Sequence, residues 1–296
     1  MKDHSIVFRR YCMVTDFQKV YDLCARCGNM QRSNGMPASF WEYAQTFGSF
    51  QYEYSHRIGL WEDNGRLVAV ATYEVSPGEA FFAVDPDYLF LSEELIQYAQ
   101  REFKDEEGDL CLCFSNAQTV MRETAEKLGF VRRGQHPEKI YQFKNGLLAY
   151  ELPDGFRFLD HSREAVDYVK LDTCLHYGFD HDGEPDGDTD FRIHMHITPN
   201  FNPRLPVIAI EESTGEYAGY ANAFVEKAGQ YAYLEPLCTQ PKYRKMGIAA
   251  AIISEMIRRV MPLGAKYITG GSSDFYTAIG YEISYYNEYW KMEGNG

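Results

Sequence analysis

The sequence predicts a mixed α/β protein built from two similar domains, and three observations support this. The chain has 296 residues, which suits two domains of ordinary size. Hydrophobic residues make up 45% and charged residues 24%, as in globular proteins that bury a large core. Both halves also show one order of patterns, β-β-β-α-β-α-β, which favours two copies of one mixed-sheet fold.

In the first half, apolar and β-branched runs alternate with stretches of helical spacing. Leu91, Leu95, Ile96 and Ala99 follow the spacing of an amphipathic helix, for example. The expected elements are strands at 66–73 and 79–84, a helix at 91–103, a strand at 110–114 and a helix at 119–128.

The second half repeats this order. The expected elements are strands at 207–210, 217–224 and 230–235, a helix at 248–260, a strand at 266–269 and a helix at 275–279. Asn145-Gly146 and Pro153-Asp154-Gly155 are turn signals between the halves. We therefore expect one domain at 1–150 and a second at 151–296.

The formal net charge of −14 argues against a nucleic-acid partner, which needs a basic surface to neutralise phosphates. The N-terminus does not resemble a signal peptide, and no apolar run is long enough to span a membrane. Seven irregularly spaced cysteines fit reduced thiols. We expect a cytoplasmic protein with no membrane partner; its oligomeric state stays open.

Metal sites receive little support. Cys24 and Cys27 could pair with Cys111 and Cys113 as zinc ligands, but the second spacing does not fit a zinc knuckle and suits a buried strand. The acidic segment 179–190 lacks the closing Glu of a calcium loop, so we expect a solvated loop, conceivably a lid near an acceptor. His194 and His196 are expected to share a strand face. No metal is expected.

The most informative stretch runs from Tyr233 to Ala249, where a strand is followed by a short turn and a helix. Arg244-x-x-Gly247-x-Ala249 places small residues where the backbone can approach a ligand closely. The first turn of a helix has amide groups without partners, and its dipole favours an anion. A pyrophosphate suits this position, and three basic residues lie within 242–245.

These motifs resemble those of the GNAT superfamily of N-acetyltransferases. The resemblance rests on Glu235-Pro236, then Pro241-x-Tyr243-Arg244-x-x-Gly247-Ile248-Ala249, then Phe275-Tyr276-x-x-x-Gly280-Tyr281, and on the element order from 153 to 292. It implies acetyl-CoA as co-substrate and a primary amine of a small molecule or peptide as acceptor, attacked directly in a ternary complex.

The resemblance also implies roles for particular residues. Backbone groups of Leu237 and Thr239 would bind the pantetheine arm, with Cys238 between them. Tyr276 would protonate the departing thiolate, and Glu235 would deprotonate the amine. The amides from Arg244 to Ala249 would hold the pyrophosphate; the residues of this loop are Arg244, Lys245, Met246, Gly247, Ile248 and Ala249.

Other interpretations of these residues stay open. Tyr276 could be a packing residue beside a glycine. Glu235, before a proline, could brace the strand end as well as act as a base. Cys238 could carry an acyl group in a ping-pong reaction, but nothing nearby in the sequence activates its thiol.

The first half departs from the family where the chemistry would lie. The stretch 84–91 has no glycine and carries acidic residues where the loop is expected, and Ala125 stands in place of the tyrosine before Leu128-Gly129. This predicts a degenerate copy that shapes the acceptor site. The alternatives for the whole chain are an acyl-CoA-binding sensor without catalysis, transfer of a longer acyl group, and aminoacyl transfer from tRNA, which the net charge disfavours.

Overall fold

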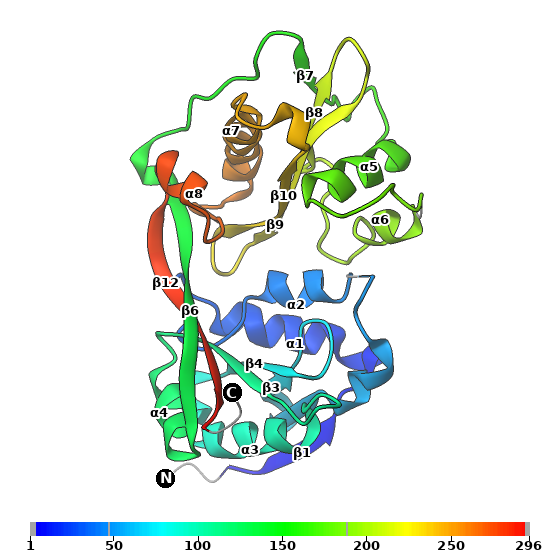
Figure 1. Ribbon diagram of the computed structural model, residues 1–296. Helices are drawn as coiled ribbons and strands as arrows, with labels where there is room; N and C mark the ends of the chain where they lie inside the picture. The colour runs from blue at the N-terminus through cyan, green and yellow to red at the C-terminus, as the bar shows by residue number, and fades with distance from the viewer. Residues whose placement is uncertain (1–3, 47, 188, 294–296) are drawn as a thin grey trace. The chain divides into compact units, whose positions relative to one another are not determined.

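A computed structural model describes residues 4–46, 48–187 and 189–293 of the chain (Figure 1). The chain forms two compact units. The N-terminal unit comprises Met1–Lys139 together with Ile283–Gly296, and the C-terminal unit comprises Ile140–Glu282. The sequence predicts a single junction near residue 150, whereas these units divide the chain after Lys139 and again after Glu282.

The N-terminal unit is built around a mixed sheet with the order β1-β2-β3-β4-β5-β12. The strands are β1 (Ile6–Arg10), β2 (Gly59–Asp63), β3 (Arg66–Thr72), β4 (Glu79–Val84), β5 (Cys111–Ser115) and β12 (Glu282–Met292). β4 and β5 pair in parallel, and the other neighbours pair antiparallel. Central strands such as β3 are almost wholly buried because the sheet carries helices on both faces.

Helices α1 (Met13–Cys27) and α2 (Ala38–Ala44) lie on one side of this sheet, and α3 (Ser92–Glu102) and α4 (Thr119–Lys127) lie on the other (Figure 1). Short 3₁₀ turns occur at η1 (Tyr52–Arg57), η2 (Pro86–Leu91) and η3 (Phe143–Asn145), the last in the C-terminal unit. The unit's core is rich in large aromatic side chains, with Trp41, Trp61 and Phe103 fully buried.

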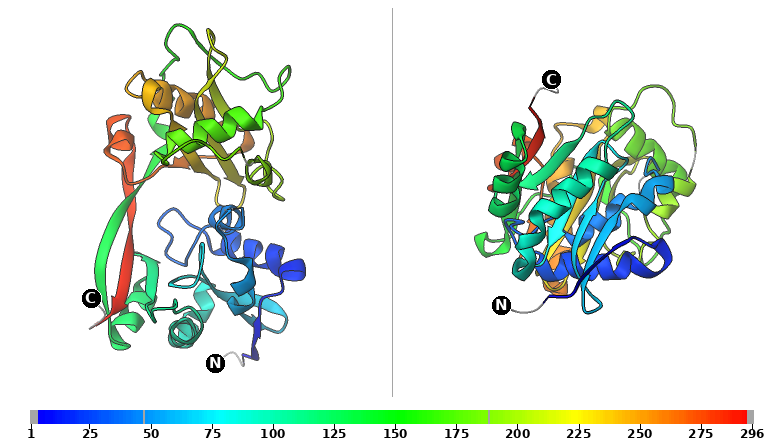
Figure 2. Two further views of the ribbon diagram at one scale, coloured as in Figure 1. Left: turned by 45° about the vertical axis from the view of Figure 1, so that its right-hand side comes forward. Right: turned by 90° about the horizontal axis from the view of Figure 1, so that it is seen from below.

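The C-terminal unit has the same kind of sheet. Its strands are β7 (Phe156–Phe158), β8 (Val207–Glu211), β9 (Tyr217–Glu226), β10 (Tyr231–Thr239) and β11 (Tyr267–Thr269). Its helices are α5 (Tyr168–Gly178), α6 (Asp190–His194), α7 (Ile248–Val260) and α8 (Asp274–Ala278), with 3₁₀ turns η4 (Pro241–Tyr243) and η5 (Met261–Leu263). One core lies under α7 and a second lies under α5, so the two helices cover opposite faces of the sheet; Figure 2 shows both from a second side.

Two strands carry the chain between the units. β6 (Phe130–Gln142) begins in the N-terminal unit, and its last three residues pair antiparallel with β11. β12 begins at Glu282, and its later residues pair antiparallel with β5 of the N-terminal unit. The last strand of the sequence therefore completes the sheet of the first unit.

The structure confirms the expected mixed α/β class and the repeated order of strands and helices. One local expectation is wrong: His194 is the last residue of α6, and His196 follows it in a turn, so the pair does not share a strand. The alternation of His194, Met195 and His196 is too short to distinguish a strand from a helix end. No helix among the described residues has the length and apolar character to cross a membrane.

Candidate active site

The candidate site begins where β10 separates from β11. The two strands pair in parallel only at Tyr231 and Ala232. Beyond that point β10 keeps only its partner β9, and its register shifts between Leu234 and Leu237. Just beyond the paired residues, the Leu234 amide donates to the side-chain hydroxyl of Thr269, the last residue of β11, at 2.9 Å. The far half of β10 thus has one edge turned away from any partner strand.

The start of α7 lies directly after this strand. Gly247 is the N-cap residue and has a left-handed conformation, with φ of 88°. Lys245 also has a left-handed conformation, with a φ of 64°. Within the described chain, no carbonyl accepts a backbone hydrogen bond from the amides of residues 245–249. A Cβ atom at Gly247 would meet nothing within 4 Å, so the space beside the Cα of this residue is open.

The basic side chains of the loop are mostly engaged within the protein. Lys242 forms an ion pair with Glu216. Arg244 donates to the carbonyl of Gly178 at 3.0 Å and lies 3.0 Å from the carboxylate of Asp180. Lys245 has no such partner among the residues described. The open amides and the Lys245 ammonium, rather than all three cations, therefore form the anion-attracting feature.

The side chains of the proposed pantetheine strand point to both faces of the sheet. Leu237 is half-buried and packs with the core under α7. Cys238 is buried under α5, with its sulfur 4.0 Å from that of Cys174. Gly178 permits this contact, since a Cβ there would lie 2.7 Å from the Cys238 sulfur. Cys238 is packed away from the strand edge, which gives no support to an acyl-cysteine.

Glu235 lies at the register shift of β10, where the Glu235–Pro236 peptide is cis. Its side chain is half-buried. Asn222 of β9 lies between the partners of Leu234 and Leu237 and therefore faces this irregularity. The Asn222 side-chain oxygen is buried and accepts no hydrogen bond from the described residues. The sequence did not indicate Asn222, because its place opposite the irregularity of β10 depends on the register of two strands.

Tyr276 lies in α8, and its ring covers the glycines that follow β11. A Cβ at Gly270 would lie 2.6 Å from the Tyr276 ring, and one at Gly271 would lie 3.3 Å from it. The ring is half-buried and stands 5.1 Å from the ring of Tyr281. The structure therefore places Tyr276 beside the end of β11, the strand from which β10 separates.

The acidic segment folds back on the end of α5. His176 contacts the carbonyl of Gly183 at 3.1 Å, and the Tyr177 hydroxyl donates to Glu184 at 2.7 Å. Asp180 contacts Arg244 as described above. Most of the segment's side chains are exposed, and no group of three or more His, Cys, Asp or Glu residues in the described chain could hold a metal ion.

A buried polar network lies on the α5 face of the sheet. His196 contacts the hydroxyl of Tyr220 at 2.8 Å through Nε2 and that of Tyr168 at 3.2 Å through Nδ1. Its ring stacks on Phe201. Burial lowers the pKa of His196 to about 4, so the imidazole is neutral at physiological pH. No pattern in the sequence indicates this network, because it joins three separate segments.

In the N-terminal unit, the turn that follows β4 is η2, and it runs directly into α3: the Ser92 amide donates to the Leu89 carbonyl of η2. Asp85 caps η2 by accepting a hydrogen bond from the Asp87 amide at 3.3 Å. The Asp85 carboxylate also pairs with Arg66 at 2.8 Å and Arg26 at 3.5 Å. Asp85 therefore satisfies the start of η2, and η2 leads into α3 without the glycine loop that precedes α7.

The open edge of β4 is also occupied. β3 pairs with one edge of β4, and β5 pairs with the other only at Glu79 and Ala80. Along the rest of that second edge, the Met36 amide donates to the Phe82 carbonyl at 3.0 Å, and the Val84 amide donates to the Asn34 carbonyl at 2.9 Å. We refer to residues 31–36, between α1 and α2, as the strap.

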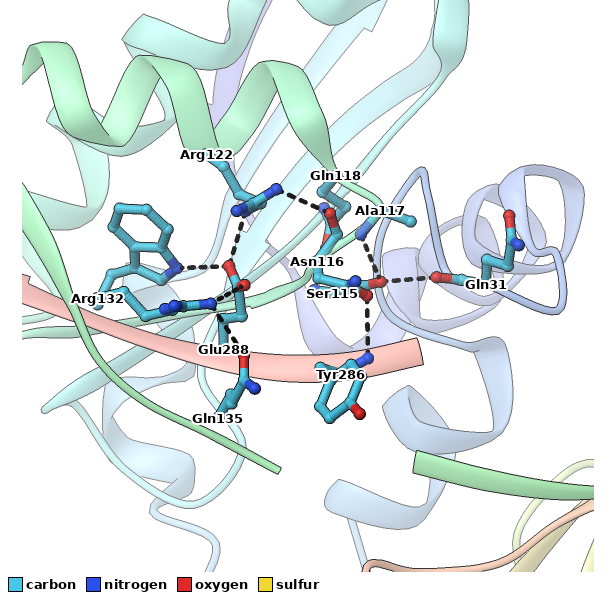
Figure 3. Close-up of polar contacts among 11 residues, drawn as sticks. Gln31, Ser115, Asn116, Ala117, Gln118, Arg122, Arg132, Gln135, Tyr286 and Glu288 are labelled. Atoms are coloured by element: carbon cyan, nitrogen blue, oxygen red, sulfur yellow. Dashed lines mark hydrogen bonds and ion pairs between the residues drawn. The ribbon is translucent and has the colours of Figure 1, made fainter. Parts of the chain in front are cut away.

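Other contacts fix the strap and the strand beside it (Figure 3). The Ser115 hydroxyl, at the end of β5, donates to the Gln31 carbonyl at 2.6 Å. On β12, the Tyr286 amide donates to the Asn116 side chain, and buried Glu288 pairs with Arg122 at 2.7 Å and with Arg132 at 2.9 Å. These contacts hold β12 in the N-terminal unit.

A strand that leaves its neighbour, followed by a glycine turn and a helix start with unpaired amides, is an arrangement suited to a phosphate-bearing ligand along a strand edge. Residues 170–281 match the acetyltransferase (GNAT) family. This part of the chain is a GNAT domain, and it contains the open half of β10, the start of α7 and Tyr276. The GNAT fold supports acyl transfer from acyl-CoA to an acceptor.

Solved structures extend the likeness of the fold to nearly the whole chain. A GCN5-related N-acetyltransferase from Sphaerobacter thermophilus has 14% identity and a TM-score of 0.59, covering 97% of this chain and 95% of that one. A tandem GNAT protein from the clavulanic acid biosynthesis pathway has 13% identity and a TM-score of 0.60, covering 99% of both chains. A GNAT-family acetyltransferase from Colwellia psychrerythraea has 11% identity and a TM-score of 0.60, covering 97% of this chain and 100% of that one. No curated protein matches the chain.

Proposed function

We propose that the chain is an N-acetyltransferase with one working site, in the C-terminal unit, that moves an acetyl group from acetyl-CoA to a primary amine of a small molecule or peptide. The observation that carries the proposal is the start of α7. There, five successive residues offer amides with no internal acceptor, and Gly247, in their midst, has open space beside its Cα. Such a helix start favours a pyrophosphate.

The residues around this helix start suit the rest of the cofactor and the reaction. The edge of β10 from Leu237 to Thr239 would pair with the amides of the pantetheine arm, in the manner of an added strand. The Arg244 side chain, bound to Gly178 and Asp180, would hold the loop in shape. Lys245 would attract the phosphates.

For the chemistry, Glu235 would take a proton from the amine, directly or through water, as the nitrogen attacks the thioester carbon. Tyr276 would give its proton to the sulfur as the carbon–sulfur bond breaks. General acid–base assistance of this kind is worth about 10²–10⁴-fold in rate. The neutral amine attacks directly, since Cys238 is buried away from the strand edge.

The N-terminal unit would be a degenerate copy that takes no acyl-CoA. Asp85 caps the turn η2, which leads into α3 without a glycine loop, and the strap pairs with the strand edge that a pantetheine arm would need. Its contribution would be structural. The proposed domains are the degenerate copy at 1–150 and the catalytic domain at 151–296.

The first test is calorimetric titration with acetyl-CoA of the unmodified chain, Gly247→Val and Gly264→Val. Both glycines have positive φ values, 88° and 97°, and open space around a built Cβ, but only Gly247 stands at the start of α7. We expect one site per chain, a loss of affinity of at least about 100-fold in Gly247→Val, and unchanged affinity in Gly264→Val.

Two results would contradict the proposal. Equal binding by both glycine variants would show that the start of α7 does not hold the cofactor. Two sites per chain would show that the N-terminal unit binds it as well. A screen of primary amines, with release of the CoA thiol as the readout, then tests acetyl transfer itself.

A further inference from the structure

The Tyr281 hydroxyl is buried in the C-terminal unit without a hydrogen-bond partner. The residue is 2% exposed and belongs to the core under α7. Its oxygen makes no hydrogen bond to any described residue. Burying a hydroxyl without a partner is unfavourable, so such a group calls for an explanation in packing or in function.

Packing alone does not require the hydroxyl. In the N-terminal unit, Phe130 occupies the matching position directly after a glycine with positive φ, and it is 1% exposed in the core. A phenylalanine therefore fills this place in the same fold. The oxygen of Tyr281 is an addition that the core does not use.

The hydroxyl-bearing ring of Tyr281 lies against Tyr276. The ring centroids are 5.1 Å apart, and the Tyr281 amide donates to the Tyr276 carbonyl at 2.9 Å. Both rings rest on Gly270, where a Cβ would lie 2.6 Å from one and 2.9 Å from the other. Burial, with Tyr276 as a lesser cause, raises the pKa of Tyr281 well above its ordinary value, so it remains a proton donor.

The two tyrosines also occur together or not at all. Tyr276 stands four residues before Gly280, and the residue four before Gly129 is Ala125. The N-terminal unit, whose strand edge is filled by the strap, thus lacks both hydroxyls. The C-terminal unit, whose helix start is open, has both.

We propose that Tyr281 is a positioning residue for Tyr276, and that in the acyl-CoA complex its hydroxyl donates a hydrogen bond to the oxygen of Tyr276. This inference rests on the proposed function. It assigns a role to a second phenol that touches neither cofactor nor acceptor.

In the transfer step, the amine nitrogen forms its bond to the thioester carbon and loses one proton to Glu235 or water. The carbon–sulfur bond breaks, and the sulfur takes the Tyr276 proton. The Tyr276 oxygen then carries a negative charge, which the Tyr281 hydrogen bond stabilises until a proton from solvent restores it. Hydrogen bonds to charged oxygens are stronger than those between neutral groups.

The test compares CoA with desulfo-CoA, which lacks the sulfur, and needs no knowledge of the acceptor. Their dissociation constants are measured by calorimetry for the unmodified chain, Tyr281→Phe and Tyr141→Phe. Tyr141 is the matched control because its ring lies 5.6 Å from that of Tyr281 but its hydroxyl donates to the Gly146 carbonyl. We expect the unmodified chain to prefer CoA, Tyr281→Phe to lose about threefold or more of that preference, and Tyr141→Phe to keep it.

A turnover measurement separates positioning from a structural role. With an accepted amine, Tyr281→Phe should lower kcat about tenfold, leave KM for acetyl-CoA nearly unchanged, and move the alkaline limb of the kcat profile upward by about one pH unit. Its melting temperature should not fall, because the lost hydroxyl has no partner in the ligand-free chain.

The outcomes distinguish the two proposals. No binding of either compound by the unmodified chain would overturn the proposed function, and this inference with it. Binding with an unchanged CoA preference in Tyr281→Phe would overturn the inference alone. A preference that falls equally in Tyr141→Phe would show a general packing effect and would also overturn it.

Discussion

The two helix starts that follow β4 and β10 show how one fold can hold an open ligand position in one unit and close it in the other. After β10, Gly247 turns the chain without a side chain, and the amides of residues 245–249 have no internal acceptor. After β4, Asp85 caps the turn and pairs with Arg66 and Arg26. The difference is whether a capped 3₁₀ turn leads directly into the next helix, as before α3, or a glycine loop with unpaired amides precedes it, as before α7.

The free edges of β4 and β10 also differ in whether a segment of the protein pairs with them. β4 and β10 each pair with a parallel neighbour over only two residues. In the N-terminal unit the strap continues along the freed edge of β4. No described segment does so along β10. A strand edge leaves backbone groups to be satisfied, and the comparison shows two solutions: an internal strap or a ligand.

The largest expected effect concerns the tyrosine that distinguishes the units. Tyr276→Phe should lower kcat by about 10²–10⁴-fold with little change in acetyl-CoA affinity, because it removes a proton donor and keeps the ring. Steady-state kinetics beside calorimetry measure both quantities, with Tyr141→Phe as control. An unchanged kcat would mean that the presence of Tyr276 in one unit and Ala125 in the other has no catalytic meaning.

A smaller effect is expected at the strap. Gly35 has a φ of 127°, and a Cβ there would lie 2.2 Å from the Phe82 carbonyl oxygen. Gly78 has a similar φ of 117°, but its nearest neighbour would be at 3.5 Å. Gly35→Ala should therefore lower the free energy of unfolding by about 1–3 kcal/mol more than Gly78→Ala.

Hydrogen exchange gives the local readout for this pair. The amides of Met36 and Val84, which bond strap and strand to each other, should exchange faster in Gly35→Ala and not in Gly78→Ala. Acetyl-CoA stoichiometry should stay at one. A second site in Gly35→Ala would show that the strap alone had closed the N-terminal unit and would weaken the importance given to Asp85.

The smallest expected effect is the pH dependence of the C-terminal unit. The pKa of His196 is about 4 in the folded chain, below its ordinary value of 6.5, chiefly because of burial. Between these values the unfolded chain binds the proton and the folded chain does not. Stability is therefore full above about pH 7 and falls as the pH drops, by about 1 kcal/mol at pH 5.5.

His196→Gln keeps a hydrogen-bonding group near Tyr220 and cannot titrate. Urea unfolding at pH 7.5 and pH 5.5 should therefore show a smaller loss of stability in the variant than in the unmodified chain. Equal losses would show that His196 does not control the acid limb. In the N-terminal unit, Glu74 should have the opposite effect on stability. Burial raises the pKa of Glu74 to about 7, so its protonation as the pH falls stabilises the folded state.

Much of the fold could be predicted from local sequence. The helix at 248–260 has a continuous apolar face, and the structure gives it the same bounds. The early helices of each unit were missed; α5, for example, has a short and irregular apolar pattern. The length of β6, at Phe130–Gln142, is not a local matter, because this strand carries the chain from one unit to the other.

The residues of the candidate site also fall into two groups, those that local sequence predicts and those that it does not. The glycine loop and Tyr276 stand out because they depend on short spacings within single segments. Asn222, the strap and the Tyr168–His196–Tyr220 network do not, because each depends on contacts between distant segments. Periodicity describes which face a residue occupies but not which residue lies opposite.

By itself, the sequence determined the mixed α/β class, the doubled order of elements and the position of the glycine turn before α7. These are local matters, since period, turn residues and helix starts act over a few positions. Only the tertiary structure decided that β12 completes the first sheet, that the strap covers the edge of β4 and that the Tyr281 hydroxyl lies buried against Tyr276. Backbone edges and buried polar groups must be satisfied by whatever segment arrives beside them, and that partner is set by the folding of the whole chain.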